Sequence, residues 1–312
     1  MFLTRKLNLE RLYDSSSGRP YETAKGHSPA WASKVDWQKG DALNPQSFAH
    51  LLPQAQGVVH TLGTLIEDGE YKTALKQGDV PALIGSFVRG AGMNGGKNPL
   101  KKGVEANGTG SYEALNRDSG LRVCEAFVSS SPSSNTGGPR PFVYISAEDI
   151  FQPFIPARYI KTKREAEQGI ALMLTDKPEY RPVFIRPSLV YHAHYRPLTT
   201  PAAVLLDLSA SLHAKVPRSL PTPSSVLRTL GAAFSGRSAS QMDASSPLES
   251  MANAMIIPPV HVDQVAAAIA IALDPTRTDV RGIINVRRMR DLIGWSDNSY
   301  EANVQPAQPR SF

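Results

Sequence analysis

The sequence predicts an α/β protein with a doubly wound, mostly parallel sheet that helices cover on both faces. Two observations favour this class: short apolar runs of strand character alternate with stretches of helical periodicity, and the apolar runs end at turn-forming residues. Sheets covered on both faces have strands that are apolar throughout. With 312 residues, 41% of them hydrophobic, the chain is long enough to bury one sizeable core.

The first half of the chain supplies two predicted strands and three predicted helices. We expect a short strand at 34–37 and a buried strand at 57–63 that ends in a glycine turn. A short helix is expected at 46–52. Apolar residues recur at helical spacing over 78–90 and 112–128, which predicts two further helices.

The second half continues the alternation of strands and helices. Pro-Phe-Val-Tyr-Ile-Ser, starting at Pro141, is a further apolar run of strand type. The helix that follows residue 262 has a plausible N-cap in Asp263. The expected strands are 141–146, 183–185 and 281–286, and the expected helices are 161–174 and 263–273.

Composition shifts divide the chain into segments. The sequence has 25 prolines and 23 glycines, which favours long loops or insertions. Serine, glycine and proline gather at 129–138 and again near residue 240, and both regions are expected to be flexible. We predict an N-terminal segment at 1–14, an incomplete sheet domain at 15–190, a small C-terminal subdomain at 191–295 with a flexible insertion at 235–250, and a disordered tail at 296–312.

Charge and cysteine content exclude several classes of protein. The single cysteine, Cys124, excludes an internal disulfide framework and a cysteine-rich zinc site. No run of 18 apolar residues suggests a transmembrane helix. The formal net charge is +6, which suits anionic partners, but the basic residues are scattered and form no stripe of the nucleic-acid-binding kind.

The first 13 residues leave two interpretations open. Arg5, Lys6 and Arg11 stand against a single acid, Glu10, among several leucines. This composition resembles a mitochondrial presequence. An ordinary surface segment explains it equally well, and no secretory signal is present.

A glycine-rich motif, Gly-x-Gly-x-x-Gly, occupies residues 90–95. Such a motif cradles a phosphate when it follows a strand and opens a helix. Here a helix-like run precedes it and Pro99 follows it. We therefore interpret it as a loop.

Tyr159 and Lys163 are the strongest catalytic candidates. Residues four apart lie on one face of a helix, so the two side chains can be neighbours. A nearby ammonium favours the phenolate and lowers the pKa of a tyrosine, which could then exchange a proton with a substrate oxygen. Ser146, at the end of the preceding predicted strand, could bind the same oxygen. An unrelated surface pair on a helix is the alternative.

These residues belong to a set of segments that resembles the extended and atypical short-chain dehydrogenase/reductases, also called the NAD-dependent epimerase/dehydratase family. The similar segments span about residues 15 to 292. A narrower resemblance is to the mitochondrial branch that holds the nucleotide-binding accessory subunit of respiratory complex I and a fungal coenzyme Q biosynthesis protein. The segments are Lys39-Gly40-Asp41-Ala42, 58–63, 112–119, Tyr144-Ile145-Ser146-Ala147 with Tyr159-x-x-x-Lys163, 185–188 and 259–266.

The resemblance implies a Rossmann-like fold, a site for NAD or NADP and a role for individual residues. It implies that Tyr159 exchanges the proton, that Lys163 orients the ribose, and that Ser146 holds the substrate oxygen. Some of the other implied residues also have a simpler explanation. Asp41 can cap a turn, and Gly63 can serve only to permit a turn. The further implied positions are Asn116 in the catalytic set, Asp41 and Ala42 near the adenine, Thr61 and Gly63 near the ribose, and Pro187 and Ser188 beside the nicotinamide.

One departure from the family concerns the start of the chain. The family opens with a strand and a glycine-rich turn that places the pyrophosphate at a helix N-terminus. No such motif precedes residue 40, so we expect the first β-α unit to be missing. Either the sequence is truncated or dinucleotide binding has been lost.

Three functions follow as hypotheses. The first is a mitochondrial short-chain dehydrogenase/reductase-like protein that supports ubiquinone biosynthesis or respiratory complex assembly, with an NAD(P)-dependent oxidoreductase activity if it is catalytic. It would lie in the matrix or at the inner membrane, as partner of a biosynthetic or respiratory complex there. The second is a non-catalytic structural or assembly protein on the same fold, since a fold does not fix a function. The third is a nucleotide-sugar epimerase or dehydratase.

Overall fold

The structure is a computed structural model of the chain. It describes residues 34–65, 111–132, 138–152, 155–191, 199–217, 220–234 and 245–295. The N-terminal segment, the predicted helix at 78–90, the glycine motif at 90–95 and the tail at 296–312 lie outside the described residues. The expected absence of a first β-α unit falls there too and stays a prediction.

Four parallel strands form the main sheet of the described residues, in the order β1-β2-β3-β6. β1 pairs with β2 through Val59 and Val143, and β2 pairs with β3 through Val143 and Val183. All neighbours are parallel, so the chain crosses a face of the sheet between one strand and the next. The strands are β1 (Val58–His60), β2 (Arg140–Ile145), β3 (Tyr180–Ile185) and β6 (Gly282–Ile284).

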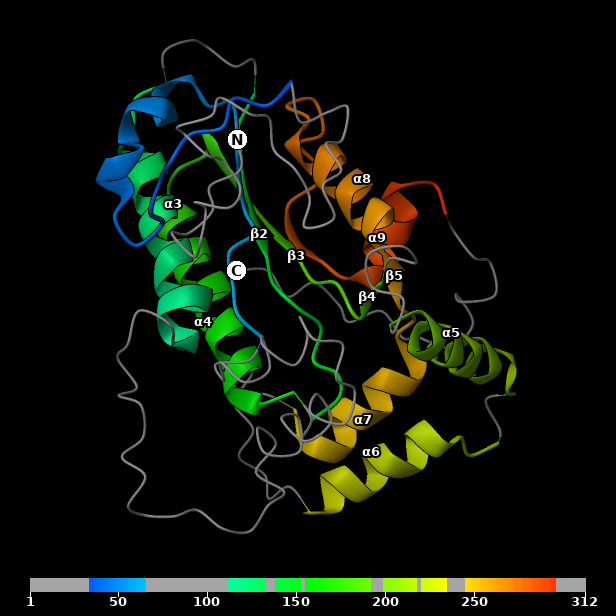
Figure 1. The fold of residues 1–312 in the computed structure, drawn as a ribbon. Helices are drawn as coiled ribbons and strands as arrows, with labels where there is room; N and C mark the ends of the chain where they lie inside the picture. Colours follow the sequence, from blue (N-terminus) through cyan, green and yellow to red (C-terminus); the bar gives the residue numbers. More distant parts are fainter. Residues whose placement is uncertain are drawn as a thin grey trace, which may run out of the picture.

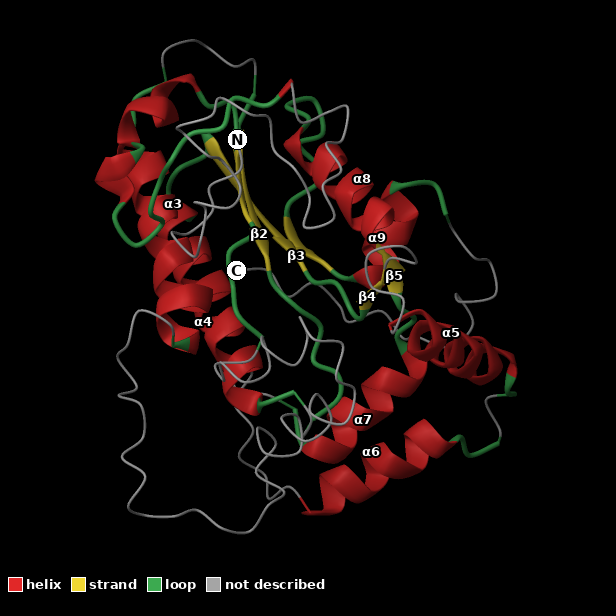
Figure 2. Cartoon of the chain, viewed as in Figure 1, coloured by secondary structure: helices red, strands yellow, loops and turns green. Residues whose placement is uncertain are grey.

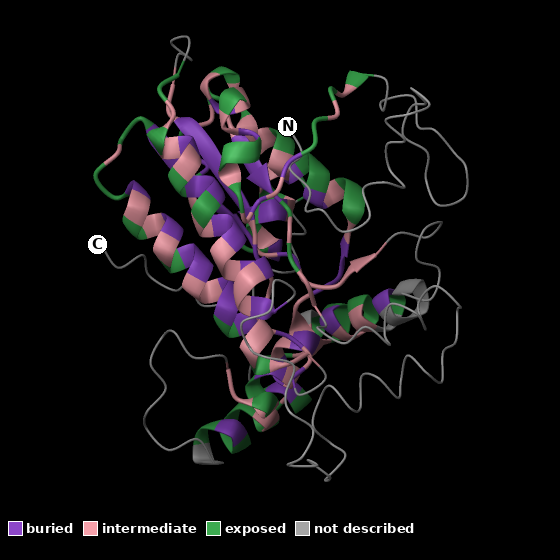
Figure 3. Cartoon of the chain, turned by 60° about the vertical axis from the view of Figure 1, so that its left-hand side comes forward, coloured by how far each residue is buried: buried purple, intermediate pink, exposed green. Residues whose placement is uncertain are grey.

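Helices lie on both faces of this sheet, α3 and α4 on one and α8 and α9 on the other (Figure 1). Successive strand residues point to opposite faces. Phe142 and Tyr144 pack in a cluster with α3 and α4, whereas Val143 packs in a second cluster with α8. The buried residues accordingly form two layers around the strands (Figure 3). These features confirm the predicted doubly wound α/β class.

The helices of the two layers connect the strands. The chain enters the first layer through a π-helix, η5 (Glu113–Asp118), that continues directly into α3. The four helices that cover the sheet are α3 (Ser119–Ser129), α4 (Ala157–Leu174), α8 (Val262–Leu273) and α9 (Val286–Leu292).

Three further helices lie at one end of the molecule, apart from the two layers (Figure 2). α5 (Thr199–Lys215) and α6 (Pro223–Phe234) both pack against α7 (Pro247–Ile256). A separate pair of short parallel strands, β4 (Val190–Tyr191) and β5 (Val260–His261), lies where the chain leaves and re-enters the main sheet region. None of the described helices is long and apolar enough to cross a membrane.

Several predicted elements differ from the structure. Residues 34–37 form no strand, and the helix predicted at 46–52 is a pair of short 3-10 helices, η3 (Pro45–Ser47) and η4 (Ala49–Gln54). Pro53 inside η4 lacks the N–H that a longer helix needs. The predicted strand at 281–286 ends at Ile284, because Asn285 caps α9.

Two boundaries were also predicted wrongly. The cap of α8 is His261, whose ring accepts from the backbone N–H of Asp263, while the side chain of Gln264 accepts from the backbone of His261. A capping box thus replaces the predicted Asp263 cap. The last residues of the flexible insertion predicted at 235–250 belong to α7, which Ser246 caps by accepting from the backbone N–H of Glu249.

Candidate functional site

The candidate residues gather at the carboxyl edge of the sheet. Gly63, Ser146 and Pro187 follow the ends of β1, β2 and β3, which are neighbours in the sheet. In doubly wound sheets this is the edge at which ligands bind. The π-helix η5 and the first turns of α4 bring Asn116, Tyr159 and Lys163 toward the same edge.

Asn116 fixes the segment that follows β1. Its Oδ1 accepts a 2.8 Å hydrogen bond from the backbone N–H of Thr64, and its Nδ2 donates one of 3.0 Å to the Thr64 carbonyl. The side chain is fully buried. The hydroxyl of Tyr144 donates to the Asn116 carbonyl. Both ends of the amide are therefore satisfied within the protein, as is usual for a buried polar side chain.

Lys163 lies against the exposed Gly63. A Cβ placed on Gly63 would lie 2.7 Å from Asn116 Oδ1 and 2.9 Å from Lys163 Nζ, so only glycine fits there without displacement. Lys163 Nζ donates a 2.9 Å hydrogen bond to the Ile145 carbonyl and lies 4.8 Å from the ring centre of Tyr144. Burial lowers the pKa of Lys163 to about 7.

Tyr159 differs from the expectation for an activated phenol. Burial raises the pKa of Tyr159 to about 12, and Arg164 is the cation that opposes this rise. Among the described residues, no hydrogen bond joins the Tyr159 hydroxyl to Ser146 or Lys163. Its ring instead makes an edge contact with Tyr112 at 6.1 Å. Lys163 therefore does not lower this pKa, contrary to expectation. The two residues share a helix face, but no hydrogen bond joins the Lys163 ammonium to the Tyr159 hydroxyl.

Ser146 belongs to a buried ion cluster. Arg164 donates a 3.0 Å hydrogen bond to the Ser146 hydroxyl and another of 3.0 Å to Glu167. The same Glu167 accepts two hydrogen bonds from Arg186, which follows β3. Glu167 is only 5% exposed, so its charge is compensated almost entirely by these two arginines.

The carboxylate of Glu167 stays ionised within this cluster. Burial by itself would raise the pKa of Glu167. The hydrogen bond from Arg186, the charges of Arg164 and Arg186 and a hydrogen bond from Ser146 outweigh burial and hold that pKa below its usual value. Sequence reasoning missed this cluster. The only signal was the three-residue spacing of Arg164 and Glu167 on one helix face.

The loop after Ser146 is anchored to α7. The Asp149 side chain accepts hydrogen bonds from Ser245 N–H and Gln152 Nε2, and its carbonyl accepts one from Asn253. Gln152 N–H in turn donates to Ser250 of α7. Phe151 within this loop has a φ of 65°. A left-handed conformation is strained for phenylalanine, and these bonds hold it.

His60, the last residue of β1, is a further buried polar group that sequence reasoning missed. Its Nε2 lies 3.2 Å from the Ser119 hydroxyl, and its ring stacks on Tyr144 at 5.6 Å. Nδ1 has no hydrogen-bond partner among the described residues. Burial and the charge of Lys163 lower the pKa of His60 to about 3, so the ring is neutral at pH 7.

The residues expected at the adenine have internal partners. Asp41 Oδ1 accepts from the backbone N–H of Leu43, and the Asp41 N–H donates to the Ser47 hydroxyl. Asp41 thus caps a turn, as its simpler interpretation predicts. Ala42 is 1% exposed and packs in the core with Phe48.

The remaining candidates lie along the same edge with different surroundings. Thr61 is exposed. The Pro187 carbonyl accepts from the Glu148 N–H, and the Ser188 hydroxyl donates a 2.6 Å hydrogen bond to the Pro258 carbonyl. Ser188 therefore joins the end of β3 to the segment that precedes β5. Their expected place beside a nicotinamide stays a prediction.

Some known proteins are similar to this chain in sequence. No protein-family model matches the chain. The chain is 32% identical over 185 residues to the protein called MIOREX complex component 2 of Saccharomyces cerevisiae. The match covers 58% of this chain and 63% of that relative. The chain thus spans less than two thirds of the length of the curated relative.

Two solved structures show a distant likeness. One is UDP-glucuronic acid 4-epimerase from Bacillus cereus in complex with NAD, at 13% identity and a TM-score of 0.28, over 56% of this chain and 47% of that one. The other is RMD from Pseudomonas aeruginosa complexed with NADPH, at 13% identity and a TM-score of 0.33, over 83% and 82%. With scores this low, we draw no inference from them about a cofactor or substrate. The α/β class follows from the sheet itself.

Proposed function

We propose that this chain is a non-catalytic component of a mitochondrial protein complex, built on a dinucleotide-binding type of fold. The observation that carries the proposal is the bond from Arg164 to Ser146. A proton-transfer site needs its serine and tyrosine directed at one substrate oxygen. Here the serine hydroxyl is part of an ion cluster, and burial raises the pKa of Tyr159.

The assignment to a complex is supported by the relative. That relative is, by its name, a component of the MIOREX complex. The basic, leucine-containing start of the chain agrees with import into mitochondria. The comparison offers no support for a role in ubiquinone biosynthesis, which stays a prediction, as does the nucleotide-sugar hypothesis.

A second candidate function is NAD(P)-dependent oxidoreduction, favoured by the surroundings of Gly63. Lys163 Nζ makes a single hydrogen bond among the described residues, to Ile145, and an ammonium has three donors. Donors therefore remain beside the exposed Gly63 for a hydroxyl of a bound ribose. When bound, a nicotinamide cofactor would supply hydride transfer. Lys163 would then orient it.

The test uses the full gene product in its native cells. Tyr159→Phe and Ser146→Ala are compared for assembly of the complex on native gels and by co-purification, with chain abundance measured in parallel. We expect assembly at wild-type levels for Tyr159→Phe. Loss of the biological output in Tyr159→Phe at normal abundance, together with saturable NADH or NADPH binding by the purified chain, would overturn the non-catalytic proposal and favour the second.

A further inference from the structure

The outer face of α5 presents a ridge of apolar side chains. Val204, Leu208 and Leu212 follow one another at four-residue spacing and are 62%, 54% and 56% exposed. The inner face of the same helix packs on α7 and buries Ala203 and Ala210. Exposed leucines in such a contiguous row are typical of an interaction surface.

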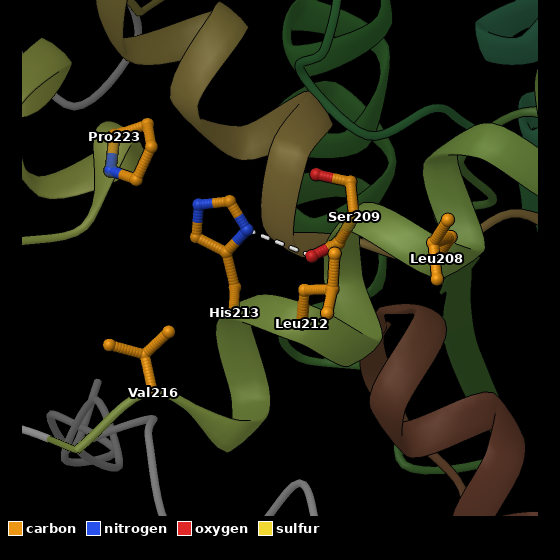
Figure 4. A pocket seen from close by; sticks show the side chains of 6 residues that line it. All are labelled: Leu208, Ser209, Leu212, His213, Val216 and Pro223. Carbon is orange, nitrogen blue, oxygen red and sulfur yellow. Dashed lines mark hydrogen bonds between the residues drawn. The ribbon is translucent and has the colours of Figure 1, made fainter.

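A hollow adjoins the ridge. Its volume is about 340 Å³, and it lies between the second half of α5 and the start of α6 (Figure 4). The polar side chain of His213 is tied down within it, because the ring nitrogen Nδ1 bonds to the Ser209 carbonyl at 2.8 Å. The hollow is lined by Leu208, Ser209, Leu212, His213, Val216 and Pro223.

The ridge is self-complementary. Val216, a half-buried residue directly after the end of α5, continues the four-residue spacing, so the row reads Val, Leu, Leu, Val and is the same in both directions. A two-fold axis between Leu208 and Leu212 would set each leucine against the other leucine of a second copy. Two-fold interfaces require such self-complementary patches. Rows of i, i+4 side chains also pack into one another, with helices crossing at about −50°.

The charges beside the ridge select the antiparallel arrangement. Asp207, with a side chain 57% exposed, is the central residue of α5 and lies 3.8 Å from Arg290. Lys215, which is exposed, is the last residue of the helix. Two antiparallel copies that cross between Leu208 and Leu212 would bring Asp207 of each helix toward Lys215 of the other. Parallel copies would set Asp207 against Asp207 and Lys215 against Lys215. An acidic partner would repel Asp207, and a basic partner would repel Lys215.

We propose that the α5 face is a homodimer interface, in which the Val204–Val216 row of one copy packs across the same row of a second copy. Leu220, which precedes α6, and Val226 and Leu230 within it are 58%, 48% and 44% exposed and would extend the contact. This proposal is independent of the proposed function, because it concerns a surface away from the carboxyl edge of the sheet.

The association test uses the full chain in analytical ultracentrifugation over a range of concentrations. We expect a concentration-dependent dimer. Leu208→Asp/Leu212→Asp should raise the dimer dissociation constant at least about tenfold. The matched control is Leu172→Asp on α4, a leucine that is 68% exposed, which should leave the dimer unchanged. Because both leucines are exposed, circular dichroism should show the same folded state for all variants.

Two further variants test the antiparallel arrangement. Asp207→Lys should weaken the dimer, and Asp207→Lys/Lys215→Asp should restore it. Ser211→Cys, near the centre of the row, should cross-link two copies on oxidation, whereas Leu172→Cys should not. The native Cys124 is buried and does not interfere. A wild-type chain that stays monomeric throughout, or that binds a different protein or lipid vesicles through this face instead, overturns the proposal.

Discussion

The Arg164 guanidinium donates a 3.0 Å hydrogen bond to the hydroxyl of Ser146. This hydrogen bond connects the end of β2 to α4. Glu167, on the same helix, accepts a hydrogen bond from Arg186, which follows β3. Two neighbouring strands and one helix are thus joined through four side chains at the edge where a ligand is expected.

Loss of the Glu167 charge should destabilise the fold strongly. Glu167→Gln leaves two partly buried arginines without their counter-ion, and breaking a buried ion pair costs about 3–5 kcal/mol. The control is Asp279→Asn, which breaks the exposed pair with Arg277 and should change the free energy of unfolding far less. Urea unfolding measures both free energies, and equal losses would contradict the structural role of the cluster.

Gly63→Ala should destabilise the chain by about 1–3 kcal/mol, the range for overpacking a filled site. The new methyl would lie 2.7 Å from Asn116 Oδ1, which two hydrogen bonds hold in place. In Gly63→Ala/Asn116→Ala the clash with the amide is gone, so the combined loss of free energy of unfolding should be smaller than the sum of the single losses. Strict additivity would show that Asn116 is not the obstacle.

Lys163 should make stability rise with pH above neutrality. Its pKa is about 7 in the folded chain and near its ordinary value of 10.5 when unfolded. Between these values the unfolded state binds more protons, so the free energy of unfolding increases with pH, by up to a few kcal/mol. Lys163→Met should lack this part of the rise. The difference between wild type and variant, measured by urea unfolding from pH 7 to pH 10, checks it, and a constant difference would refute it.

His60 should produce a loss of stability in acid. Its pKa is lowered from 6.5 to about 3, so the neutral ring contributes stability fully above pH 6.5. That contribution is lost as the pH falls toward 3, because the unfolded state takes up the proton first. His60→Gln cannot take up this proton. The wild type should therefore lose up to a few kcal/mol more than His60→Gln between pH 6.5 and pH 4, and parallel losses would contradict the prediction.

The sequence predicted the elements of the main sheet best. The strands that became β1, β2 and β3 each contain a run of apolar residues, as is typical of strands covered on both faces. The helices that became α4 and α8 were predicted with their correct C-terminal ends. α5 was missed, since alanines occupy its buried face while Leu208 and Leu212 are exposed, which weakens the helical pattern. α6 was missed as well. α7 was missed altogether, although Ser246, Pro247 and Glu249 form a known N-terminal pattern.

Sequence by itself determined the α/β class and the edge of the sheet at which Gly63, Ser146 and Lys163 meet, because both follow from local periodicity and from where apolar runs end. Only the tertiary structure decided which polar groups bond to one another. The contact between Arg164 and Ser146 spans 18 residues, and that between Glu167 and Arg186 spans 19. Such partners are set by how α4 crosses the strands, a relation that no local pattern in the chain encodes.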